Sequence, residues 1–590
     1  MKLLRMSGIR RAYWLGPSFV VAALIIPSGI ALFDRASLHQ AALLGMQGDP
    51  ASEGLFTLQY ALLTIGLSAG VASGALAIYH RAPARRLLHL GLFCILLELF
   101  YRIAYGGAVS SGVLLSVPET SQRETVELLA GHPILTCSLT LVALLSVCAL
   151  VVSWRTDIRF SVRRCVQVGA VSASMVLASL AIGEYQFGDA RVLKPVILAE
   201  AAATFPFDIA KAFGAVAIGL IDTRRNASRR ADFRFPNVRM VDAALRGAAS
   251  EIYVVVIGET SRRKNWSLFG YSRVTTPLLD AIGNDLIPFD HVTSNATTTI
   301  LSVPLALTRA APATRRLARS EKSVITLLNQ AGFETYWISN QERPGVVSNP
   351  IYQIALEADH VSFPEDMQAS ARTGGYDSNL LTRVDDGLAS LPKGRKVVIF
   401  LHMEGSHFAY GERYPVGFDR FRDGQDAPRI LPHRQMDFVD EYDNSVYFTD
   451  YNLRKIIDRL TLCSCRSGLI FFSDHGERLF DNGSGDADFG HGFPTISRPE
   501  IEIPFFLWLS SAYQDANPAL TARLKANAHS VAQLDNLFET IADLAGVDYE
   551  NRAAALSLFS DKLQSPNKLD VLNMQEETVS LPVEQDPGEP

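Results

Sequence analysis

Apolar residues run with few charged interruptions through five stretches in the first third of the chain, each about 20 residues long. A stretch of this length can cross the roughly 30 Å hydrocarbon core of a bilayer as one α-helix, and a buried core helix is rarely so long and so free of charge. The stretches are Tyr13–Phe33, Phe56–Tyr79, Leu87–Val109, Pro133–Trp154 and Val166–Ile182. In the third stretch Glu98 is followed one turn later by Arg102, and we expect this pair to face the helix bundle or the interface rather than to take part in catalysis. The pattern predicts an α-helical transmembrane bundle of five spans over residues 1–182.

Basic residues gather in alternate connections between these stretches. Those before the first stretch, between the second and third, and between the fourth and fifth are Lys2, Arg5, Arg10, Arg11, Arg81, Arg85, Arg86, Arg155, Arg159, Arg163 and Arg164. The other two connections, residues 34–55 and 110–132, carry only Arg35 and Arg123 as cations. Because cytoplasmic loops are enriched in Lys and Arg, the basic connections are predicted to be cytoplasmic. An odd number of crossings then carries the remaining two thirds of the chain out of the cytoplasm.

Residues 183–247, which follow the apolar stretches, mix two features. An apolar piece, Phe205–Leu220, precedes a basic run made of Arg224, Arg225, Arg229, Arg230 and Arg234. An apolar face beside cations suits the headgroup region of an anionic membrane, which predicts an interfacial helix followed by a linker. Two alternatives stay open from the sequence, a sixth span and a solvated linker.

After about Ala248 the pattern changes to short β-branched and aromatic runs that alternate with segments of helical period. The predicted strands are Ile252–Ile257, Glu334–Ile338, Val397–His402, Leu469–Ser473 and Ile503–Leu509. The predicted helices include Lys322–Ala331, Tyr376–Leu391, Tyr442–Leu460 and Val531–Ala545. This alternation is typical of an α/β domain with a largely parallel central sheet, here over residues 248–563.

Composition adds two expectations. The tail, residues 564–590, is acidic, contains proline and has little to bury, so it is predicted to be disordered. Four of the six cysteines lie in or beside the apolar stretches, which leaves Cys463 and Cys465 in the α/β domain. A framework of several disulfides is excluded there, and the pair is either two free thiols or a labile disulfide.

Metal-binding residue types stand directly after two of the predicted strands. Glu259 closes the run Ile252–Ile257, and Asp474 and His475 close the run Gly468–Ser473. The carboxyl ends of parallel strands are where open α/β sheets place their chemistry. Because carboxylate and imidazole together suit a divalent ion such as zinc, the sequence predicts a metal site and an enzyme.

Six motifs occur in an order that points to a known family: Gly258–Asn265, Leu268–Pro277, Ser294–Pro304, Leu401–His407, Ser473–Glu477 and Gly490–Gly492. With the five apolar stretches they resemble the membrane-bound phosphoethanolamine transferases of Gram-negative bacteria, members of the alkaline phosphatase/sulfatase superfamily. Four further segments resemble the members that modify the lipopolysaccharide core: Tyr336–Gln341, Gly405–Pro415, Tyr442–Asn444 and Asp543–Gly546. The resemblance covers nearly the whole chain and implies an alkaline-phosphatase/sulfatase-like fold for the α/β domain.

The resemblance also assigns roles to individual residues. Glu259, Asp474 and His475 match the zinc ligands of the family. Thr299 matches the threonine nucleophile that also contacts the metal. Although two more threonines precede it, Thr299 is followed by an apolar residue and lies before Pro304 at the spacing of the family pattern.

Three histidines complete the implied site. His407 and His491 match histidines that hold the transferred phosphoryl group or a second zinc ion, and His402 is a further candidate for the same pocket. Such side chains would stabilise charge on the phosphoryl oxygens in the transition state. Glu404 either contacts the amine of the donor or faces solvent, and Glu477 is expected to be structural.

The implied reaction moves phosphoethanolamine from phosphatidylethanolamine to a lipopolysaccharide acceptor, a core sugar or lipid A, through a covalent intermediate on Thr299. A threonine hydroxyl is too weak a nucleophile at neutral pH unless its alkoxide is made accessible, which one or two zinc ions would do. Such an enzyme is a multi-pass protein of the bacterial inner membrane with its catalytic domain in the periplasm, and we expect no nucleic-acid partner. Several relatives that act on lipid A carry a cysteine just upstream of the nucleophile, and its absence around Asn295 favours a core sugar or another acceptor.

Other functions make different demands on the sequence. A sulfatase needs Cys or Ser in a C/S-x-P-x-R context to make its formylglycine, and the residues around Thr299 do not supply it. A phosphoglycerol transferase of the same superfamily shares the spans, the threonine and the metal, and differs in the donor head group. A non-catalytic, membrane-anchored binding or sensory protein on this scaffold would be expected to lack some of the metal-binding residues. All four of them are present: Glu259, Thr299, Asp474 and His475.

Overall fold

The computed structural model describes residues 50–78, 98–102, 109–116, 162–187, 207–241, 250–343, 349–364, 375–389, 394–429, 431–463, 465–481, 488–493 and 495–583, with short helical pieces between 136 and 144. The chain forms two compact units, one made of residues 1–115 and 125–217 and the other of residues 116–124 and 218–590. The first unit holds the apolar stretches, and the second holds the α/β domain.

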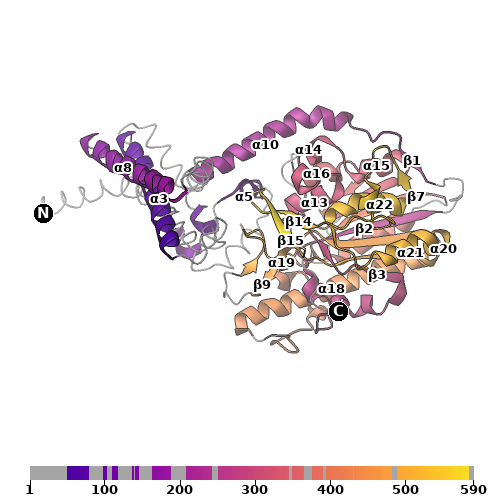
Figure 1. Ribbon diagram of the computed structural model, residues 1–590. Helices are drawn as coiled ribbons and strands as arrows, with labels where there is room; N and C mark the ends of the chain where they lie inside the picture. Colours follow the sequence, from indigo (N-terminus) through magenta and orange to yellow (C-terminus); the bar gives the residue numbers. More distant parts are fainter. Residues whose placement is uncertain are drawn as a thin grey trace, which may run out of the picture. The chain divides into compact units, whose positions relative to one another are not determined.

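Two long helices of the first unit pack together through small side chains. They are α3, Pro50–Ile78, and α8, Val162–Phe187 (Figure 1). A Cβ atom added at Gly66 of α3 would lie 3.0 Å from a methyl carbon of Val176 in α8, so the backbones approach closely. Serine hydroxyls also bond across the interface to backbone carbonyls, in the pairs Ser73–Cys165, Ser172–Gly66 and Ser179–Gln59. Small residues and hydroxyls at the contact are typical of helix pairs in membranes.

Apolar side chains cover the outer face of α8, where Val166, Val168, Val171 and Leu177 are exposed. Within the described residues, the one helical segment that is long and apolar enough to cross a membrane is Cys165–Ile182. Helices therefore stand at the second and fifth predicted spans. The first predicted span and most of the third and fourth lie outside the described residues, so the count of five remains a prediction.

Glu98 and Arg102, in the described part of the third stretch, form a buried ion pair. Glu98 also accepts a hydrogen bond from the backbone N–H of Val109 at 2.9 Å, shortly before helix α5, Ser111–Ser116. The pair faces the interior of the unit, as expected for charges within an apolar stretch.

Within the segment predicted as an interfacial helix and a linker, the structure describes one long helix, α10, Phe207–Asp232, which carries the chain from the first unit into the second. Its apolar part, Ile209–Gly219, is shorter than a membrane span. The basic run is helical as far as Asp232, and the interfacial position of the helix remains a prediction. Arginine and alanine favour the helix, and no proline or glycine interrupts the segment after Gly219.

The second unit is built on a seven-stranded sheet in the order β3-β11-β8-β2-β7-β5-β6. Its strands are β2 Glu251–Gly258, β3 Leu286–Pro288, β5 Glu334–Ser339, β6 His360–Ser362, β7 Lys396–His402, β8 Arg466–Ser473 and β11 Phe505–Leu509. The neighbours from β8 to β6 are parallel, but β11 runs antiparallel to both β8 and β3, so the sheet is mixed rather than parallel throughout. Between β8 and β11 the described residues form only short elements, and β11 returns along the sheet in the direction opposite to β8.

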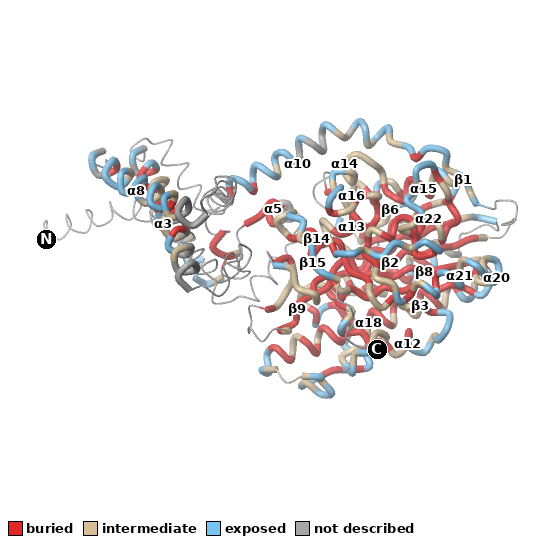
Figure 2. The backbone as a smooth tube through the Cα atoms, viewed as in Figure 1, coloured by how far each residue is buried: buried red, intermediate tan, exposed pale blue. Residues whose placement is uncertain are grey.

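The central strand β2 is buried along its whole length because both faces of the sheet are covered (Figure 2). Alternate residues enter two cores, one with Tyr253, Val255 and Ile257 and the other with Ile252, Val254 and Val256. Helices that close the first core are α13 Thr299–Leu307, α15 Val324–Gln330, α16 Pro350–Ala355, α20 Ser511–Ala516, α21 Pro518–Ala526 and α22 Leu537–Ala545. Those that close the second are α12 Pro277–Asp280, α17 Ser378–Ala389 and α18 His433–Leu462. Burial on both faces explains why the strand is a continuous apolar run in the sequence.

The tail contradicts the prediction of disorder. Residues 568–572 and 578–582 form a hairpin, β14–β15, in which Leu569, Val571 and Leu572 are buried. The backbone of Leu572 bonds to that of Asn295 at 2.9 Å and to that of Thr297 at 3.1 Å. The overall acidity of the tail was misleading, because its short apolar run is enough to pair with itself and to bury side chains against the folded unit. Residues after 583 lie outside the described part.

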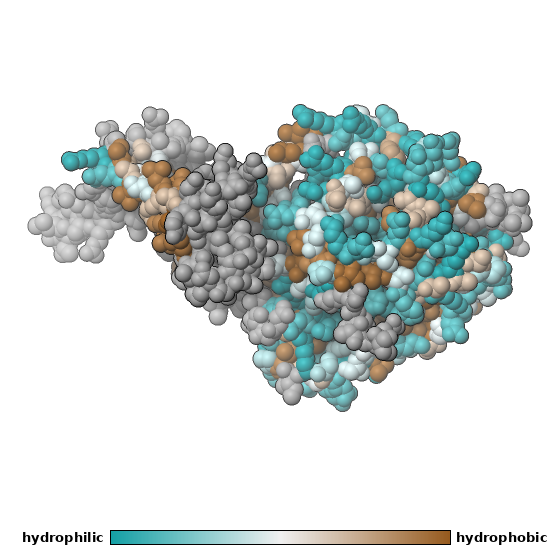
Figure 3. Space-filling view, viewed as in Figure 1, coloured by the Kyte–Doolittle hydropathy of each residue, from teal (hydrophilic) through white to brown (hydrophobic). Residues whose placement is uncertain are grey.

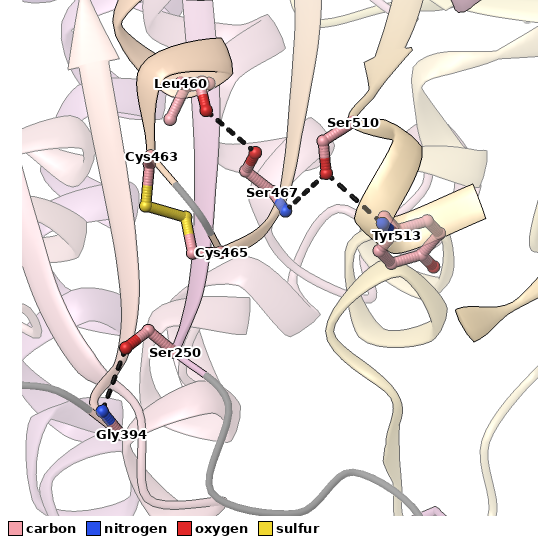
Figure 4. The surroundings of a disulfide bond; sticks show 8 residues. All are labelled: Ser250, Gly394, Leu460, Cys463, Cys465, Ser467, Ser510 and Tyr513. Carbon is pink, nitrogen blue, oxygen red and sulfur yellow. Dashed lines mark hydrogen bonds between the residues drawn. A yellow bond between two sulfur atoms is a disulfide. The ribbon is translucent and has the colours of Figure 1, made fainter. Parts of the chain in front are cut away.

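Further short strands form two-stranded sheets: β1 Arg239–Met240 with β13 Val547–Asp548, β4 Val292–Thr293 with β12 Ala532–Gln533, and β9 Arg478–Leu479 with β10 Phe489–Gly490. Cys463 and Cys465 form a disulfide between the end of α18 and the start of β8 (Figure 4). Of the two alternatives for this pair, the structure contains the disulfide. Beside it, the N–H of Ser467 donates to Ser510 Oγ at 3.0 Å, which anchors the first turn of α20 to β8.

Replacing Leu572 by alanine tests whether the tail belongs to the folded unit. Leu572 is 1% exposed and packs with Ala296 and Leu305, so its truncation leaves a cavity beside the segment that leads into α13. We expect Leu572→Ala to lower the free energy of unfolding of the second unit by about 2–5 kcal/mol, measured by chemical denaturation with tryptophan fluorescence. The matched control is Leu462→Ala, which should be nearly neutral because Leu462 is 85% exposed. Equal denaturation midpoints for the two variants would contradict a folded tail.

Candidate metal centre

Three candidate ligands lie at the carboxyl ends of two neighbouring strands. Glu259 follows β2, and Asp474 and His475 follow β8, which pairs in parallel with β2. The two strands end level, since Gly258 is opposite Ser473. One ligand atom from each of the three residues lies within 4.8 Å of the other two, and all three residues are buried. The structure thus brings together the ligands that the sequence singled out.

Thr299 reaches this cluster from another element. It is the first residue of α13, and its Oγ1 lies 3.1 Å from each carboxylate oxygen of Glu259 and 3.3 Å from His475 Nε2. The hydroxyls of Thr297 and Thr298 are buried and have no hydrogen-bond partner among the described residues. The first N–H groups of a helix lack partners within the helix, so this end of α13 favours negative charge. Of the three consecutive threonines, Thr299 is therefore the one placed to act with the cluster.

The cluster holds two buried carboxylates side by side. Burial and the neighbouring charges shift the pKa values of both. Burial acts to raise the pKa of Glu259, but hydrogen bonding and the charges of His475 and His407 hold that pKa well below its ordinary range. Burial raises the pKa of Asp474 to about 7, and the adjacent charge of Glu259 acts in the same direction. Burial acts to lower the pKa of His475, but the carboxylates of Asp474 and Glu259 outweigh it and raise the pKa to about 10. The two carboxylates need nearby positive charge, which a protonated imidazole or a divalent cation can provide.

The donor atoms fit a zinc ion. His475 Nδ1 lies 2.8 Å from the carbonyl oxygen of Gly476 and donates to it, so the lone pair of the neutral ring is on Nε2, facing Glu259 and Thr299. Asp474 Oδ1 accepts from two backbone N–H groups, at 3.0 and 2.7 Å, while Oδ2 accepts no hydrogen bond within the part of the chain that the structure describes. One imidazole nitrogen, two carboxylates and a threonine oxygen match a tetrahedral zinc site.

Two residues to which the sequence assigned no role hold Glu259 in place. Thr260 has a positive φ of 55°, and its hydroxyl donates to Glu259 Oε1 at 2.7 Å. Gln341 donates from Nε2 to Glu259 Oε2 at 3.0 Å and to the carbonyl oxygen of Met403 at 2.9 Å. A left-handed conformation in a β-branched residue persists where the surrounding structure imposes it, often at functional sites. The sequence offered one indication that Gln341 belongs to the site. It follows β5 closely, at the edge of the sheet where the candidate ligands lie.

Two glycines let neighbouring loops press against the ligand-bearing segments. A Cβ atom added at Gly405, where φ is 52°, would lie 2.7 Å from the carbonyl oxygen of Glu259. One added at Gly476 would lie 2.1 Å from the carbonyl oxygen of Pro499. Any larger residue at either position would displace the backbone around the cluster.

His491 lies beside His475, with ring centroids 4.2 Å apart. Its Nδ1 is 3.2 Å from Glu477 Oε1, and the other carboxylate oxygen of Glu477 accepts from the hydroxyl of Tyr410 at 3.0 Å. Glu477, expected to be structural, therefore orients a histidine of the site. The contact between Glu477 and His491 could not be predicted from the sequence. The two residues stand at opposite ends of a segment, and the pairing of β9 with β10 brings those ends together.

The other two histidines differ in their surroundings. His407 is half-buried on the loop after β7, close enough for its charge to lower the pKa of Glu259. His402 is the last residue of β7 and lies in the interior, with Nδ1 3.5 Å from Ser339 Oγ. Burial lowers the pKa of His402 to about 4, against the opposing charge of Glu259, so its ring is neutral at pH 7. Glu404, the acid between them, lies 3.5 Å from the guanidinium of Arg413.

The chain is similar to several known proteins. Residues 251–547 match the family model described as Sulfatase. The phosphoethanolamine transferase EptC of Escherichia coli K12 is 30% identical over 301 residues, which are 50% of this chain and 51% of the relative. EptA of Salmonella typhimurium is 31% identical over 312 residues, 51% of this chain and 54% of the relative. The chain thus spans about half the length of these curated relatives.

Two solved structures are also similar. The C-terminal periplasmic domain of EptC from Escherichia coli, in complex with Zn, is 26% identical with a TM-score of 0.54, and the match covers 59% of this chain and 96% of that domain. The integral membrane protein lipooligosaccharide phosphoethanolamine transferase A of Neisseria meningitidis aligns over 91% of this chain and 98% of its own. Its TM-score of 0.71 at 21% identity shows a shared fold. The chain belongs to the sulfatase family, and the two curated relatives named above are phosphoethanolamine transferases.

Proposed function

We propose that the protein is a zinc-dependent phosphoethanolamine transferase of the bacterial inner membrane, multi-pass, with its second unit in the periplasm. It moves phosphoethanolamine from phosphatidylethanolamine to a lipopolysaccharide acceptor, a core sugar or lipid A. The observation that carries the proposal is the contact of Thr299 Oγ1 with Glu259 and His475 in the buried cluster that also holds Asp474. The names of the relatives and the zinc complex of the EptC domain support it.

In the first displacement the hydroxyl of Thr299 attacks the phosphorus of the donor. A bond forms between Oγ1 and phosphorus, the bond from phosphorus to the glycerol oxygen breaks, and diacylglycerol leaves with a proton. Glu259, Asp474 and His475 would hold the zinc ion, which would lower the pKa of the Thr299 hydroxyl and polarise the phosphoryl oxygen. The N–H groups at the start of α13 favour the negative charge that builds on the phosphoryl oxygens.

In the second displacement a hydroxyl of the acceptor attacks the phosphorus held on Thr299. The bond between phosphorus and Oγ1 breaks, the product carries the phosphoethanolamine, and Thr299 recovers its proton. His491, beside His475 and 24% exposed, is placed to hold the phosphoryl group or a second zinc ion, and His407 can serve the same group. A lipid donor and a lipid-linked acceptor account for a catalytic unit that is joined to apolar helices such as α8.

Replacing Thr299 by alanine tests the nucleophile. Purified full-length protein, incubated with zinc and phosphatidylethanolamine, should carry a phosphoethanolamine adduct on the peptide that contains Thr299. We expect the adduct to be absent from Thr299→Ala and turnover to fall by about 10³-fold or more, because the covalent step is removed. Peptide mass spectrometry and release of diacylglycerol measure the two effects.

The matched control is Thr298→Ala, because Thr298 is the neighbouring threonine and its hydroxyl has no hydrogen-bond partner among the described residues. It should retain the adduct and most of the turnover. An adduct from phosphatidylglycerol in place of phosphatidylethanolamine would identify a phosphoglycerol transferase. If the zinc-loaded protein takes an adduct from neither lipid, the proposal fails.

Replacing Gln341 by leucine tests the support of Glu259. The substitution removes a donor to the carboxylate and keeps the size of the side chain, so we expect zinc affinity to fall by about 10–100-fold, as for other residues that orient a ligand. Competition with a chelator, followed by metal analysis, measures the affinity.

Gln514→Leu is the control for this test, because Gln514 makes the same kinds of bond elsewhere, to the carboxylate of Asp285 and the carbonyl oxygen of Leu509. Its zinc affinity should match that of the parent. Unchanged affinity in Gln341→Leu would remove Gln341 from the metal centre.

A further inference from the structure

A basic pocket of about 580 Å³ lies on the second unit and shares no lining residue with the metal centre. It is formed where the end of α10 meets α14, Leu317–Ser320, with α15 and α16. Its charged lining consists of Arg230, Arg234, Arg319, Lys322 and Glu357. The volume is within the usual range for small-molecule sites.

A partly buried ion pair builds one wall of this pocket. Arg230 Nη2 lies 2.5 Å from Glu357 Oε1, and Arg230 Nη1 donates to the carbonyl oxygen of Ala318 at 2.8 Å. The other oxygen of Glu357 accepts from the N–H and the hydroxyl of Ser323, at 2.8 and 2.7 Å, and from the hydroxyl of Thr326 at 2.9 Å. Both oxygens of the Glu357 carboxylate therefore have partners, one in α10 and the others at the start of α15.

Among the residues that line the pocket, four are cations and one, Glu357, is an anion. Arg234 donates to the carbonyl oxygens of Ala231 and Phe233, and Arg319 has its nearest carboxylate, Glu576, at 3.7 Å. Burial lowers the pKa of Lys322, and the charges of Arg234 and Arg230 lower it further, against Glu357 and Asp232. Like charges gathered in this way repel one another, and a bound anion would relieve the repulsion.

The shape of the lining narrows the class of anion. Arginine presents a planar fork of donors that matches the oxygens of phosphate, and lysine adds a point charge. Leu356, an exposed apolar residue, lines the same pocket although most of the visible surface of the second unit is polar (Figure 3). An apolar side chain beside cations suits a phosphate that is attached to an apolar group.

We propose that this pocket binds a phosphate group, with the head group of an anionic lipid as the source favoured by the apolar side chain of Leu356. Free phosphate offers the same oxygens and differs in lacking the apolar part. The site is separate from the transferase chemistry proposed above and does not depend on it.

The test uses the full-length protein in detergent, with Thr299→Ala in every sample so that no lipid is turned over. The pocket variant is Arg319→Gln with Lys322→Gln. The control is Arg523→Gln with Lys525→Gln, which removes the same charge from exposed positions on α21. Native mass spectrometry counts adducts of phosphatidylglycerol and of phosphatidylcholine, and thermal melting reports on inorganic phosphate.

We expect the parent and the control to take up phosphatidylglycerol in preference to phosphatidylcholine, and the pocket variant to bind it at least about tenfold more weakly, because two charged donors to the phosphate are removed. Stabilisation by inorganic phosphate that the pocket variant loses, without loss of lipid adducts, would assign the pocket to free phosphate. Lys322→Glu, which reverses one charge and leaves Arg319 in place, should reproduce the loss. If the pocket variants bind both probes as the control does, the proposal is overturned.

Discussion

The burial of two carboxylates next to each other, on Glu259 and Asp474, is the constraint on which the second unit depends. An isolated buried charge costs several kcal/mol, so each must be paired or hydrogen-bonded. The carboxyl ends of β2 and β8 meet this need because backbone N–H groups converge where parallel strands end, and two of them donate to Asp474. His475 supplies the remaining positive charge from within the same turn. At this edge of the sheet, hydrogen bonds and a positive charge thus offset the cost of burying the two carboxylates. The surrounding loops hold the carboxylates in that position.

Supports for the cluster come from both faces of the sheet. On the face covered by α18, the hydroxyl of Tyr442 donates to the carbonyl oxygen of Thr260 and accepts from the N–H of Arg262, each at 2.8 Å. On the same helix Asp443 accepts from Asn265 at 2.6 Å and from Arg273 at 2.8 Å, which fixes the loop that follows Glu259. On the other face, the hairpin β14–β15 pairs with residues 295–297 and so holds the segment that leads into α13. The three candidate ligands and Thr299 are therefore positioned by different cores and meet at the edge of the sheet.

Much of this arrangement could be predicted from the sequence, because buried parallel strands are continuous apolar runs whose ends are marked by the polar residues that follow. Glu259, Asp474 and His475 were found in that way, and the resemblance to a known family singled out Thr299. The direction of β11 could not be predicted, since periodicity reports burial and not strand direction. The hairpin of the tail was missed because its apolar run is short and becomes stable only against a surface that other segments form. Gln341 and Glu477 act through contacts with residues distant in the sequence, and such contacts leave no local pattern.

The charged groups of the second unit fall into two kinds, which differ in how their charge is balanced. At the metal centre the carboxylates and their partners are buried, so solvent and salt screen them little, and the cluster must be balanced internally whatever the ionic strength. At the pocket on α10 the one carboxylate, Glu357, is fully bonded, whereas Arg234 and Lys322 keep a surplus of positive charge at the surface. Repulsion between such exposed cations is screened by salt and is reduced when an anion binds from solution. The candidate metal centre is therefore suited to hold a cation whatever the salt concentration, whereas binding of the proposed anion in the pocket should weaken as the ionic strength rises.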